Sequence, residues 1–221
     1  GEVLGFFGLV GAGRSEVMTS LFGVNRLDSG EVYVEGKKHN FNDTTEAIKA
    51  GLALIPEDRR QQGLFMKQNV KFNEMIIKMK DINRGGVIDV KQETAIAEEF
   101  KQSLNVKTPT LYKTVGELSG GNQQKVVIAK WLMMSPKVLI LDEPTRGIDV
   151  GAKSEIYRLI NELAAKGVAV IVISSELIEI LGISDRVIVM NEGRITGELI
   201  TERTNSAEIM VAALGGKKVS K

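Results

Sequence analysis

The sequence predicts an α/β fold built on a mostly parallel sheet flanked by helices. Short apolar runs rich in β-branched residues alternate with segments of helical periodicity, which is typical of strands joined by crossover helices. Hydrophobic residues make up 43% of the 221 residues, enough for a substantial core. Two further segments alternate between apolar and polar residues, which adds a small antiparallel part to the prediction.

The strand candidates follow from these runs. Residues 3–9, 52–55, 138–141, 168–173 and 186–190 are the candidates for the main sheet. Residues 31–36 (EVYVEG) and 193–199 (GRITGEL) are the exposed, antiparallel candidates.

The clearest helix signal lies at 151–166. One face of this segment carries Ile156, Leu159, Ile160 and Leu163, and Gly167 ends the pattern. Residues 69–105 also carry helical patterns but contain no buried-strand run, so they interrupt the alternation. We expect an inserted helical subdomain at about 60–120.

Composition excludes several classes of function. The chain has no cysteine, which excludes disulfides and thiolate metal sites. The net charge is +1 with acids and bases interspersed, which argues against a nucleic-acid partner or a polybasic membrane patch. The longest apolar runs are too short to cross a bilayer, and the absence of a signal peptide favours the cytosol.

The segment 8–17, GLVGAGRSEV, follows a strand candidate and opens a helical pattern. Gly8, Gly13 and Ser15 are in register with the phosphate-binding loop G-x-x-x-x-G-K-[ST], but Arg14 stands where that loop has lysine. A dinucleotide fingerprint is an alternative, although Glu16 occupies its third glycine position. A tight turn without a ligand is another, and this segment alone leaves all three open.

Two carboxylates follow the apolar run at 138–141. Asp142 and Glu143 come at the C-terminal end of this predicted strand, which is where such sheets bind ligands. One carboxylate can hold a magnesium ion, and the next can act as a base toward an attacking water. The alternative is a turn that uses the same residues for their turn propensity.

The segment 118–132, LSGGNQQKVVIAKWL, places two glycines before a helical pattern. The glycines would let the backbone approach a ligand closely, and a helix start is an anion-binding end. The alternative is a serine-capped helix in which the glycines have no ligand.

Together, the phosphate loop, LSGGNQQ, LDEPT and GID stand in an order that resembles the nucleotide-binding domain of ATP-binding cassette (ABC) proteins over nearly the whole chain. The resemblance implies a P-loop NTPase-like fold that binds ATP and Mg²⁺. It also implies that Asp149 belongs to an inter-domain loop, a role compatible with a helix N-cap.

The resemblance assigns roles to individual residues. It implies nucleotide binding by Gly8, Gly11, Ala12, Gly13, Arg14, Ser15, Glu16, Glu57 and Ser175, metal binding by Ser15 and Asp142, and catalysis by Glu143. It implies a signature that faces a partner's ATP at Leu118, Ser119, Gly120, Gly121 and Gln123, and an inter-domain loop containing Gly147 and Asp149.

Three positions depart from the family pattern. Arg14 replaces the phosphate-loop lysine, Glu57 replaces the glutamine that senses magnesium, and Ser175 replaces the switch histidine. Serine cannot relay a proton near neutral pH as imidazole does, and the planar guanidinium is not equivalent to an ammonium. Glu57 would bring a negative charge toward phosphates unless magnesium or Arg59 offsets it. We interpret the domain's own site as degenerate and its signature as intact.

This asymmetry resembles the second, C-terminal cassette of tandem ATPases in bacterial sugar importers of the ribose, galactose and xylose type. The resemblance implies that residues 1–221 are one nucleotide-binding domain, excised from a longer protein and missing its first strands. Its partners would be the first cassette of the same protein, transmembrane permease subunits and, indirectly, a periplasmic or extracellular sugar-binding protein. The protein would lie at the cytoplasmic face of the membrane, and the full protein, rather than this chain alone, would be the ATPase.

Other functions remain as alternatives. A DNA-repair ABC protein should contain a long coiled coil before the signature, and residues 69–105 are too short for one. A translation-type ABC protein should carry basic surfaces, and none is evident. An importer ATPase for another small solute is also consistent with the motifs, whereas a dinucleotide oxidoreductase leaves LSGGNQQ and LDEPT unexplained.

Overall fold

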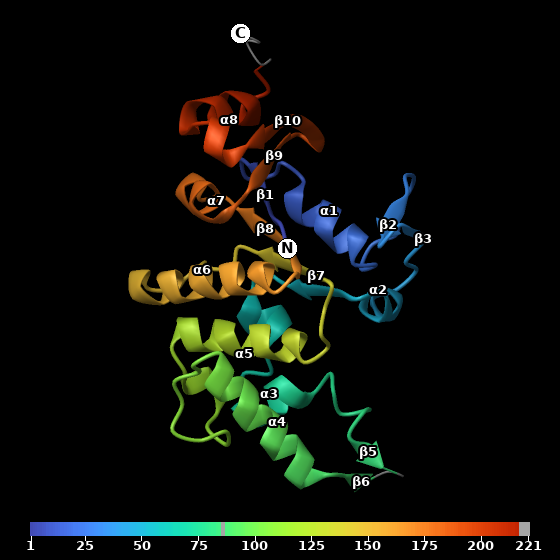
Figure 1. The fold of residues 1–221 in the computed structure, drawn as a ribbon, viewed down its shortest axis with the longest axis vertical. Coiled ribbons are helices and arrows are strands. Elements are labelled where there is room, and N and C mark those ends of the chain that lie inside the picture. Colours follow the sequence, from blue (N-terminus) through green and yellow to red (C-terminus); the bar gives the residue numbers. More distant parts are fainter. Residues whose placement is uncertain (85–86, 217–221) are drawn as a thin grey trace. The chain divides into compact units, whose positions relative to one another are not determined.

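A computed structural model describes residues 1–84 and 87–216, and its elements divide between two units (Figure 1). The sheet unit comprises Gly1–Leu54, Lys137–Pro144 and the described residues from Ile160 onward. The helical unit comprises Ile55–Pro136 and Thr145–Leu159. Among the described residues, no helix is both long and apolar enough to cross a membrane.

The sheet unit contains a six-stranded sheet in the order β10-β9-β1-β8-β7-β4. Its strands are β1 (Val3–Gly8), β4 (Leu52–Ile55), β7 (Val138–Asp142), β8 (Ala169–Ser174), β9 (Arg186–Asn191) and β10 (Arg194–Ile200). β1 pairs in parallel with β8 and β9, β7 pairs in parallel with β8, and β10 is antiparallel to β9. The mostly parallel sheet and its antiparallel edge are as predicted.

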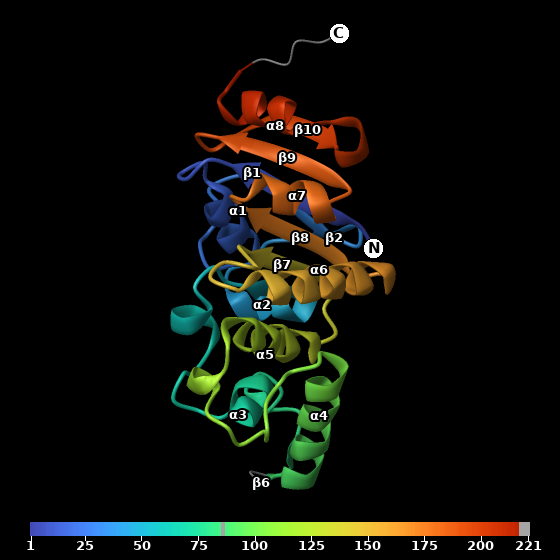
Figure 2. The ribbon, with the colours of Figure 1, turned by 90° about the vertical axis from the view of Figure 1, so that its left-hand side faces the viewer.

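A second, small antiparallel pair joins β2 (Val32–Val34) to β3 (Lys37–His39). The helices α1 (Arg14–Leu21), α2 (Thr44–Ala50), α7 (Leu177–Ile183) and α8 (Ser206–Ala213) belong to this unit, which also contains the short 3-10 turn η3 (Thr201–Arg203). In Figure 2, α7 lies over β1 and β8, and α8 lies over β9 and β10.

Burial explains why the central strands are continuous apolar runs. Leu139, Leu141 and Val172 of β7 and β8 are completely buried, as expected of parallel strands covered on both faces. Because β1, β8 and β7 run in the same direction, their carboxyl ends meet at one edge of the sheet. The segments that follow these three ends carry the candidate site.

The helical unit is larger than the predicted subdomain at about 60–120. It contains α3 (Val70–Met75), α4 (Val90–Ser103), α5 (Gly120–Leu132), the π-helical turn η1 (Arg59–Gly63), the 3-10 turn η2 (Val115–Glu117) and the short strands β5 (Asn83–Arg84) and β6 (Val87–Ile88). The difference arises because α5 packs against α3, α4 and η1, so the signature helix belongs to this unit. The long helix α6 (Val150–Ala165) begins in the helical unit, close to the predicted range of 151–166.

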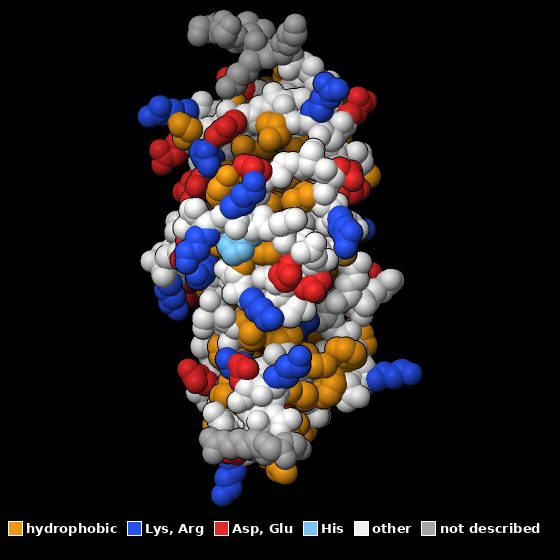
Figure 3. Space-filling model, turned by 90° about the vertical axis from the view of Figure 1, so that its right-hand side faces the viewer, with side chains coloured by type: hydrophobic (Ala, Val, Ile, Leu, Met, Phe, Trp, Pro, Cys, Tyr) orange, Lys and Arg blue, Asp and Glu red, His pale blue; other side chains and the backbone are white. Residues whose placement is uncertain are grey.

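Hydrophobic side chains gather in the lower half of Figure 3, over the helical unit. Phe65 is 53% exposed and packs edge-on against Phe72, with 5.6 Å between ring centroids. Tyr112 of the same unit is 63% exposed. Contiguous exposed hydrophobic patches are typical of surfaces that contact another protein.

Glu74 of α3 is completely buried, and neither of its carboxyl oxygens has a hydrogen-bond partner among the described residues. The pKa of Glu74 is raised to about 8, mainly by burial, with a smaller contribution from Glu98 that Lys101 opposes. The carboxyl group is therefore mostly protonated at neutral pH.

This burial predicts an unusual pH dependence of stability. The folded state binds the Glu74 proton more tightly than the unfolded state, so this group's contribution to the unfolding free energy should fall as pH rises from about 4.5 to about 8. Glu74→Gln keeps the size without the titration. In urea unfolding, the difference in unfolding free energy between the variant and the wild type should shift in favour of the variant by a few kcal/mol from pH 5.5 to pH 8.5. Glu99→Gln, an exposed change on α4, is the control, and parallel pH profiles for wild type and Glu74→Gln would contradict the prediction.

Candidate nucleotide-binding site

The phosphate-loop candidate forms the predicted connection from β1 to α1. A Cβ at Gly8 would lie 2.5 Å from the Met190 carbonyl oxygen, so only glycine lets the loop leave the sheet here. Gly11 and Gly13 have φ values of 83° and 91°, a left-handed conformation that favours glycine. Gly13 is also the N-cap of α1. The strand–turn–helix context that the motif requires is present.

Ala12 holds this loop in place. Its N–H donates to the Leu9 carbonyl at 3.0 Å, and its own carbonyl accepts from the Gly193 N–H at 3.0 Å. The loop is thus fastened to the turn between β9 and β10. The first turn of α1 follows directly, with N–H groups that have no partner within the helix, and exposed Glu16 adds a negative charge there.

Arg14 turns toward a carboxylate of its own unit. Its Nη2 lies 3.7 Å from Glu143 Oε1, and the two side chains are only 10% and 12% exposed. Arg14 Nη1 is buried and has no hydrogen-bond partner among the described residues. The charge that would meet phosphate in a standard loop is therefore already close to an opposite charge.

Ser15 and Asp142 form the second pair of the site. The Ser15 hydroxyl hydrogen-bonds to Asp142, whose side chain is buried and whose Oδ1 has no partner among the described residues. Burial raises the pKa of Asp142, while Ser15 and Arg14 lower it. A hydroxyl and an unpartnered carboxylate oxygen are the hard ligands that magnesium prefers, so this pair fits the ion.

Glu143 is held at the end of β7 in a strained conformation with φ 47°. Its N–H donates to the Ile173 carbonyl at 2.8 Å, and its Oε1 accepts from the Ser175 N–H at 2.8 Å. Burial raises the pKa of Glu143, while hydrogen bonds from the Ser175 hydroxyl and amide lower it. Ser175 therefore fixes the carboxylate but offers no imidazole for proton relay.

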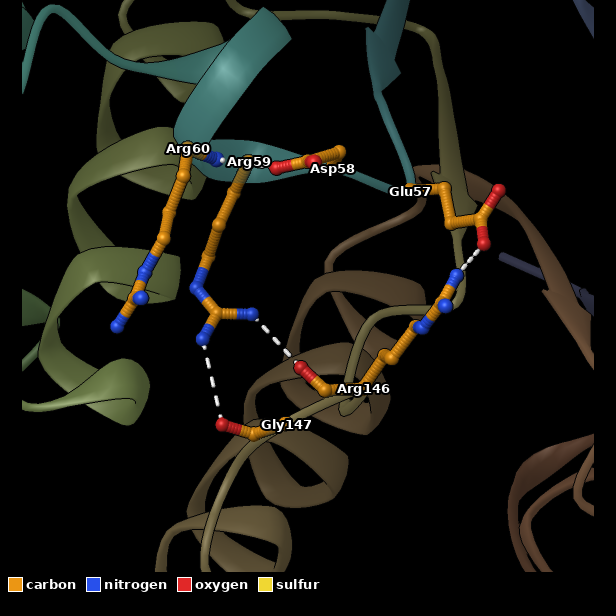
Figure 4. A pocket seen from close by; sticks show the side chains of 6 residues that line it. All are labelled: Glu57, Asp58, Arg59, Arg60, Arg146 and Gly147. Carbon is orange, nitrogen blue, oxygen red and sulfur yellow. Dashed lines mark hydrogen bonds and ion pairs between the residues drawn. The ribbon is translucent and has the colours of Figure 1, made fainter.

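Glu57, the third departing residue, lies in the other unit. Its carboxylate forms an ion pair with Arg146, as Figure 4 shows. Arg59, which we considered as the offsetting charge, donates instead to two backbone carbonyls, those of Arg146 at 2.7 Å and Gly147 at 3.3 Å. The negative charge of Glu57 is therefore balanced by Arg146 rather than by Arg59.

These residues line one open pocket of about 490 Å³. Its lining is strongly charged and consists of Glu57, Asp58, Arg59, Arg60, Arg146 and Gly147. Figure 4 shows Arg59 reaching from η1 toward the turn at 146–147, with Arg60 beside it.

The signature begins with Ser119, the N-cap of α5. Ser119 Oγ accepts from the Asn122 side-chain amide at 2.9 Å and, more weakly, from the Asn122 backbone N–H at 3.5 Å. The serine-capped helix that we considered as an alternative is therefore present. Ser119 remains exposed, so capping and contact with an outside ligand are compatible.

The two signature glycines have neighbours inside the unit. A Cβ at Gly120 would lie 2.8 Å from Arg59 Nη2 and 2.9 Å from the Gly147 carbonyl oxygen. A Cβ at Gly121 would lie 2.6 Å from the Ala152 Cβ. We attributed these glycines to ligand approach, but internal packing already requires them.

Gln123 is completely buried. Its side-chain amide donates to the carbonyls of Val115 and Leu118, and its Oε1 accepts from Arg60 Nε at 3.3 Å. In this structure Gln123 supports the backbone at Leu118, itself buried, rather than facing outward.

The aspartate loop, residues 146–149, leads into α6. Asp149 Oδ1 accepts from the Ala152 N–H at 2.9 Å, which is the predicted N-cap contact. Ser119, Gly121 and Asn122 line a pocket of about 270 Å³ with Lys107, Lys125, Asp149, Gly151, Ala152 and Glu155. The signature and the aspartate loop thus share one surface of the helical unit.

Sequence reasoning missed the structural roles of Arg60 and Arg146. For Arg60 the available signal was the arginine pair that follows PED. The partners could not be read from spacing, since Arg60 and its partner Gln123 are 63 residues apart, and Arg146 pairs with the distant Glu57.

Comparisons with known proteins point to one family. Residues 1–146 match the family described as ABC transporter. The chain is 50% identical over 217 residues to the ribose import ATP-binding protein of Lactococcus lactis subsp. cremoris, covering 98% of this chain and 44% of that protein. It is 50% identical over 218 residues to the xylose import ATP-binding protein of Geobacillus kaustophilus, covering 98% and 43%. The chain therefore spans less than half the length of these relatives.

Solved structures share the fold. A nucleotide-free ATP-binding cassette from an ABC transporter is 26% identical with a TM-score of 0.75, covering 99% of this chain and 86% of that one. A dimeric cassette in a post-hydrolysis state, bound to ADP and phosphate, has a TM-score of 0.75 at 22% identity, covering 90% and 85%. With its phosphate loop, paired carboxylates and signature in the family order, the chain belongs to the ABC transporter family.

Proposed function

We propose that this chain is the second cassette of a tandem ATPase that drives sugar import, and that its signature completes the ATP site of the first cassette. The names of the ribose and xylose import relatives, which are about twice as long, support both the sugar and the tandem arrangement. The observation that supports an inactive site in this domain is the Arg14–Glu143 ion pair. This pair joins the cation of the phosphate loop to the candidate catalytic carboxylate. An importer for another small solute is the alternative.

The domain's own site, in this proposal, binds nucleotide without turning it over. A general base must meet the attacking water, yet Glu143 is held by Ser175 and faces Arg14. Ser15 and Asp142 would hold Mg²⁺, which would neutralise phosphate charge. The start of α1 would supply N–H donors, so ATP here would act at most as a structural clamp.

The partner-facing surface, by contrast, has the expected donors. Ser119 is exposed at the start of α5, with the aspartate loop beside it. We propose that this surface meets the first cassette of the same protein, and that the exposed aromatic side chains of the helical unit, Phe65 and Tyr112, meet a permease subunit. The protein would then lie at the cytoplasmic face of the membrane, with the sugar-binding protein acting through the permease and no nucleic acid involved.

The first test separates the two halves of the domain in the full-length protein assembled with its permease. Ser119→Ala removes a donor aimed at the partner's ATP and should lower ATP hydrolysis and sugar uptake roughly a hundred- to thousand-fold. Glu143→Gln should lower both less than ten-fold. Ser119→Ala is a cleaner change than Gly121→Asp, because a side chain at Gly121 would strike Ala152.

Ser154→Ala, an exposed change on α6, is the matched control and should keep full activity. A loss of activity in Glu143→Gln as severe as in Ser119→Ala would show that this domain's own pocket is catalytic.

The second test measures nucleotide affinity of this chain by calorimetry with Mg²⁺. We expect dissociation constants for ATP from micromolar to millimolar, roughly −8 to −4 kcal/mol. Glu143→Gln should tighten ATP binding roughly ten-fold, about 1.4 kcal/mol, because it frees Arg14 and removes a negative charge near the phosphates. Nanomolar binding by the wild-type chain would mean that Arg14 already serves as a good phosphate ligand.

The third test concerns hydrolysis by this chain alone. Each composite site lacks its other half, so phosphate release should stay far below about 1 per second, even at high protein concentration with Mg²⁺. Turnover at or above that rate would rule out a degenerate site.

A further inference from the structure

We infer that Arg59 is a positioning residue, which holds the aspartate loop and the signature in the arrangement that ATP hydrolysis in the partner cassette requires. This inference rests on the proposed function of the signature.

The Arg59 side chain links segments that are far apart in the sequence. The residue is 8% exposed, and its two terminal nitrogens donate to consecutive backbone carbonyls of the aspartate loop, Arg146 and Gly147 (Figure 4). Hydrogen bonds from a charged donor are roughly twice as strong as neutral ones. The planar fork of arginine suits two neighbouring acceptors, which a single ammonium does not.

The same guanidinium lies against the signature. A Cβ at Gly120 would stand 2.8 Å from Arg59 Nη2 and 2.9 Å from the Gly147 carbonyl oxygen. Arg59, Gly147 and the first residue of α5 therefore pack without room for another atom. Any shift of the guanidinium would therefore displace both the aspartate loop and the backbone next to Ser119.

The turn η1 supports this arrangement from the other side. The Asp58 side chain accepts from the N–H groups of Arg60 and Gln61, which caps a π-helical turn, a rare element often found at functional sites. Arg60 then donates to Gln123, whose amide donates to the Leu118 carbonyl. Two adjacent arginines thus brace the aspartate loop and the start of the signature.

A contribution to folding stability does not by itself explain why the charged Arg59 side chain is buried here. Arg59 Nε has no hydrogen-bond partner among the described residues, so part of the cost of burying the guanidinium is not recovered. Well-packed apolar residues often stabilise such sites as well or better. Fixing two loops at once is a role that an apolar side chain cannot fill.

The test uses the full-length protein assembled with its permease. Arg59→Met keeps much of the volume and removes every donor, so kcat for ATP should fall at least ten-fold while KM for ATP stays within about two-fold. The split is expected because the first cassette still binds ATP, whereas hydrolysis depends on loop placement, where a misplacement of about 1 Å can cost a hundred-fold. Arg59→Lys restores one donor and should recover at least about three-fold of the lost kcat.

Two further variants make the result specific. Arg203→Met, an exposed change on η3, should leave kcat unchanged. Adding Arg59→Met to Ser119→Ala should lower kcat by less than two-fold more, because both changes act on the same partner site. If Arg59→Met does not assemble, Arg59→Lys alone should still show a several-fold loss of kcat at constant KM.

The outcomes separate the two proposals. If Ser119→Ala abolishes hydrolysis but Arg59→Met and Arg59→Lys keep wild-type kcat, the inference on Arg59 is wrong and the proposed function stands. If Ser119→Ala is harmless, the proposed function itself fails. Loss of kcat in Arg59→Met without any recovery in Arg59→Lys would indicate a general structural role and also overturn the inference.

Discussion

Parallel pairing of β1, β8 and β7 is the constraint on which the candidate nucleotide site depends. The register aligns Val3 with Val170 and Val138 with Ala169, so the three strands end at the same edge of the sheet. Gly8, Asp142 and Ser174 are their last residues. A slip of one residue in any pair would shift one strand end by about 3.3 Å relative to its neighbours and so move the residues that follow it. The hydrophobic core thus fixes the site geometry before any ligand arrives.

Electrostatics then decides what such a site can do. Arg14 keeps the positive charge of a phosphate loop, but the adjacent strand end supplies Glu143 at 3.7 Å, and both are largely withdrawn from water. An ion pair in that setting competes directly with phosphate for the guanidinium. In the helical unit, Glu57 likewise forms an ion pair within the chain, with Arg146. In both units, a side chain that the family motif directs at nucleotide instead has a partner within the chain.

Sequence alone predicted the elements well because their signals are local. The strand at 52–55 has its predicted bounds, and the other predicted strands of the main sheet are found within one residue, since continuous apolar runs mark buried strands. The candidate at 31–36 is shorter, Val32–Val34, and the short strands β3, β5 and β6 were not predicted. The helical unit also includes α5, beyond the expected range of about 60–120, because tertiary packing rather than periodicity assigns this helix to it. The contacts of Arg59 were also out of reach, because backbone carbonyls leave no trace in residue identity. The roles of the individual site residues stay predictions that the experiments above address.

The glycines of the signature show how packing and function can share one constraint. Gly121 is pressed against Ala152 and Gly120 against Arg59, so a side chain at either position would separate α5 from the aspartate loop. Ser119, next to these glycines, stays exposed at the start of α5, where backbone N–H groups lack intrahelical partners. A helix start of this kind favours anions. Internal packing therefore preserves the surface that we propose for the partner's ATP, whereas we interpret the domain's own site as degenerate.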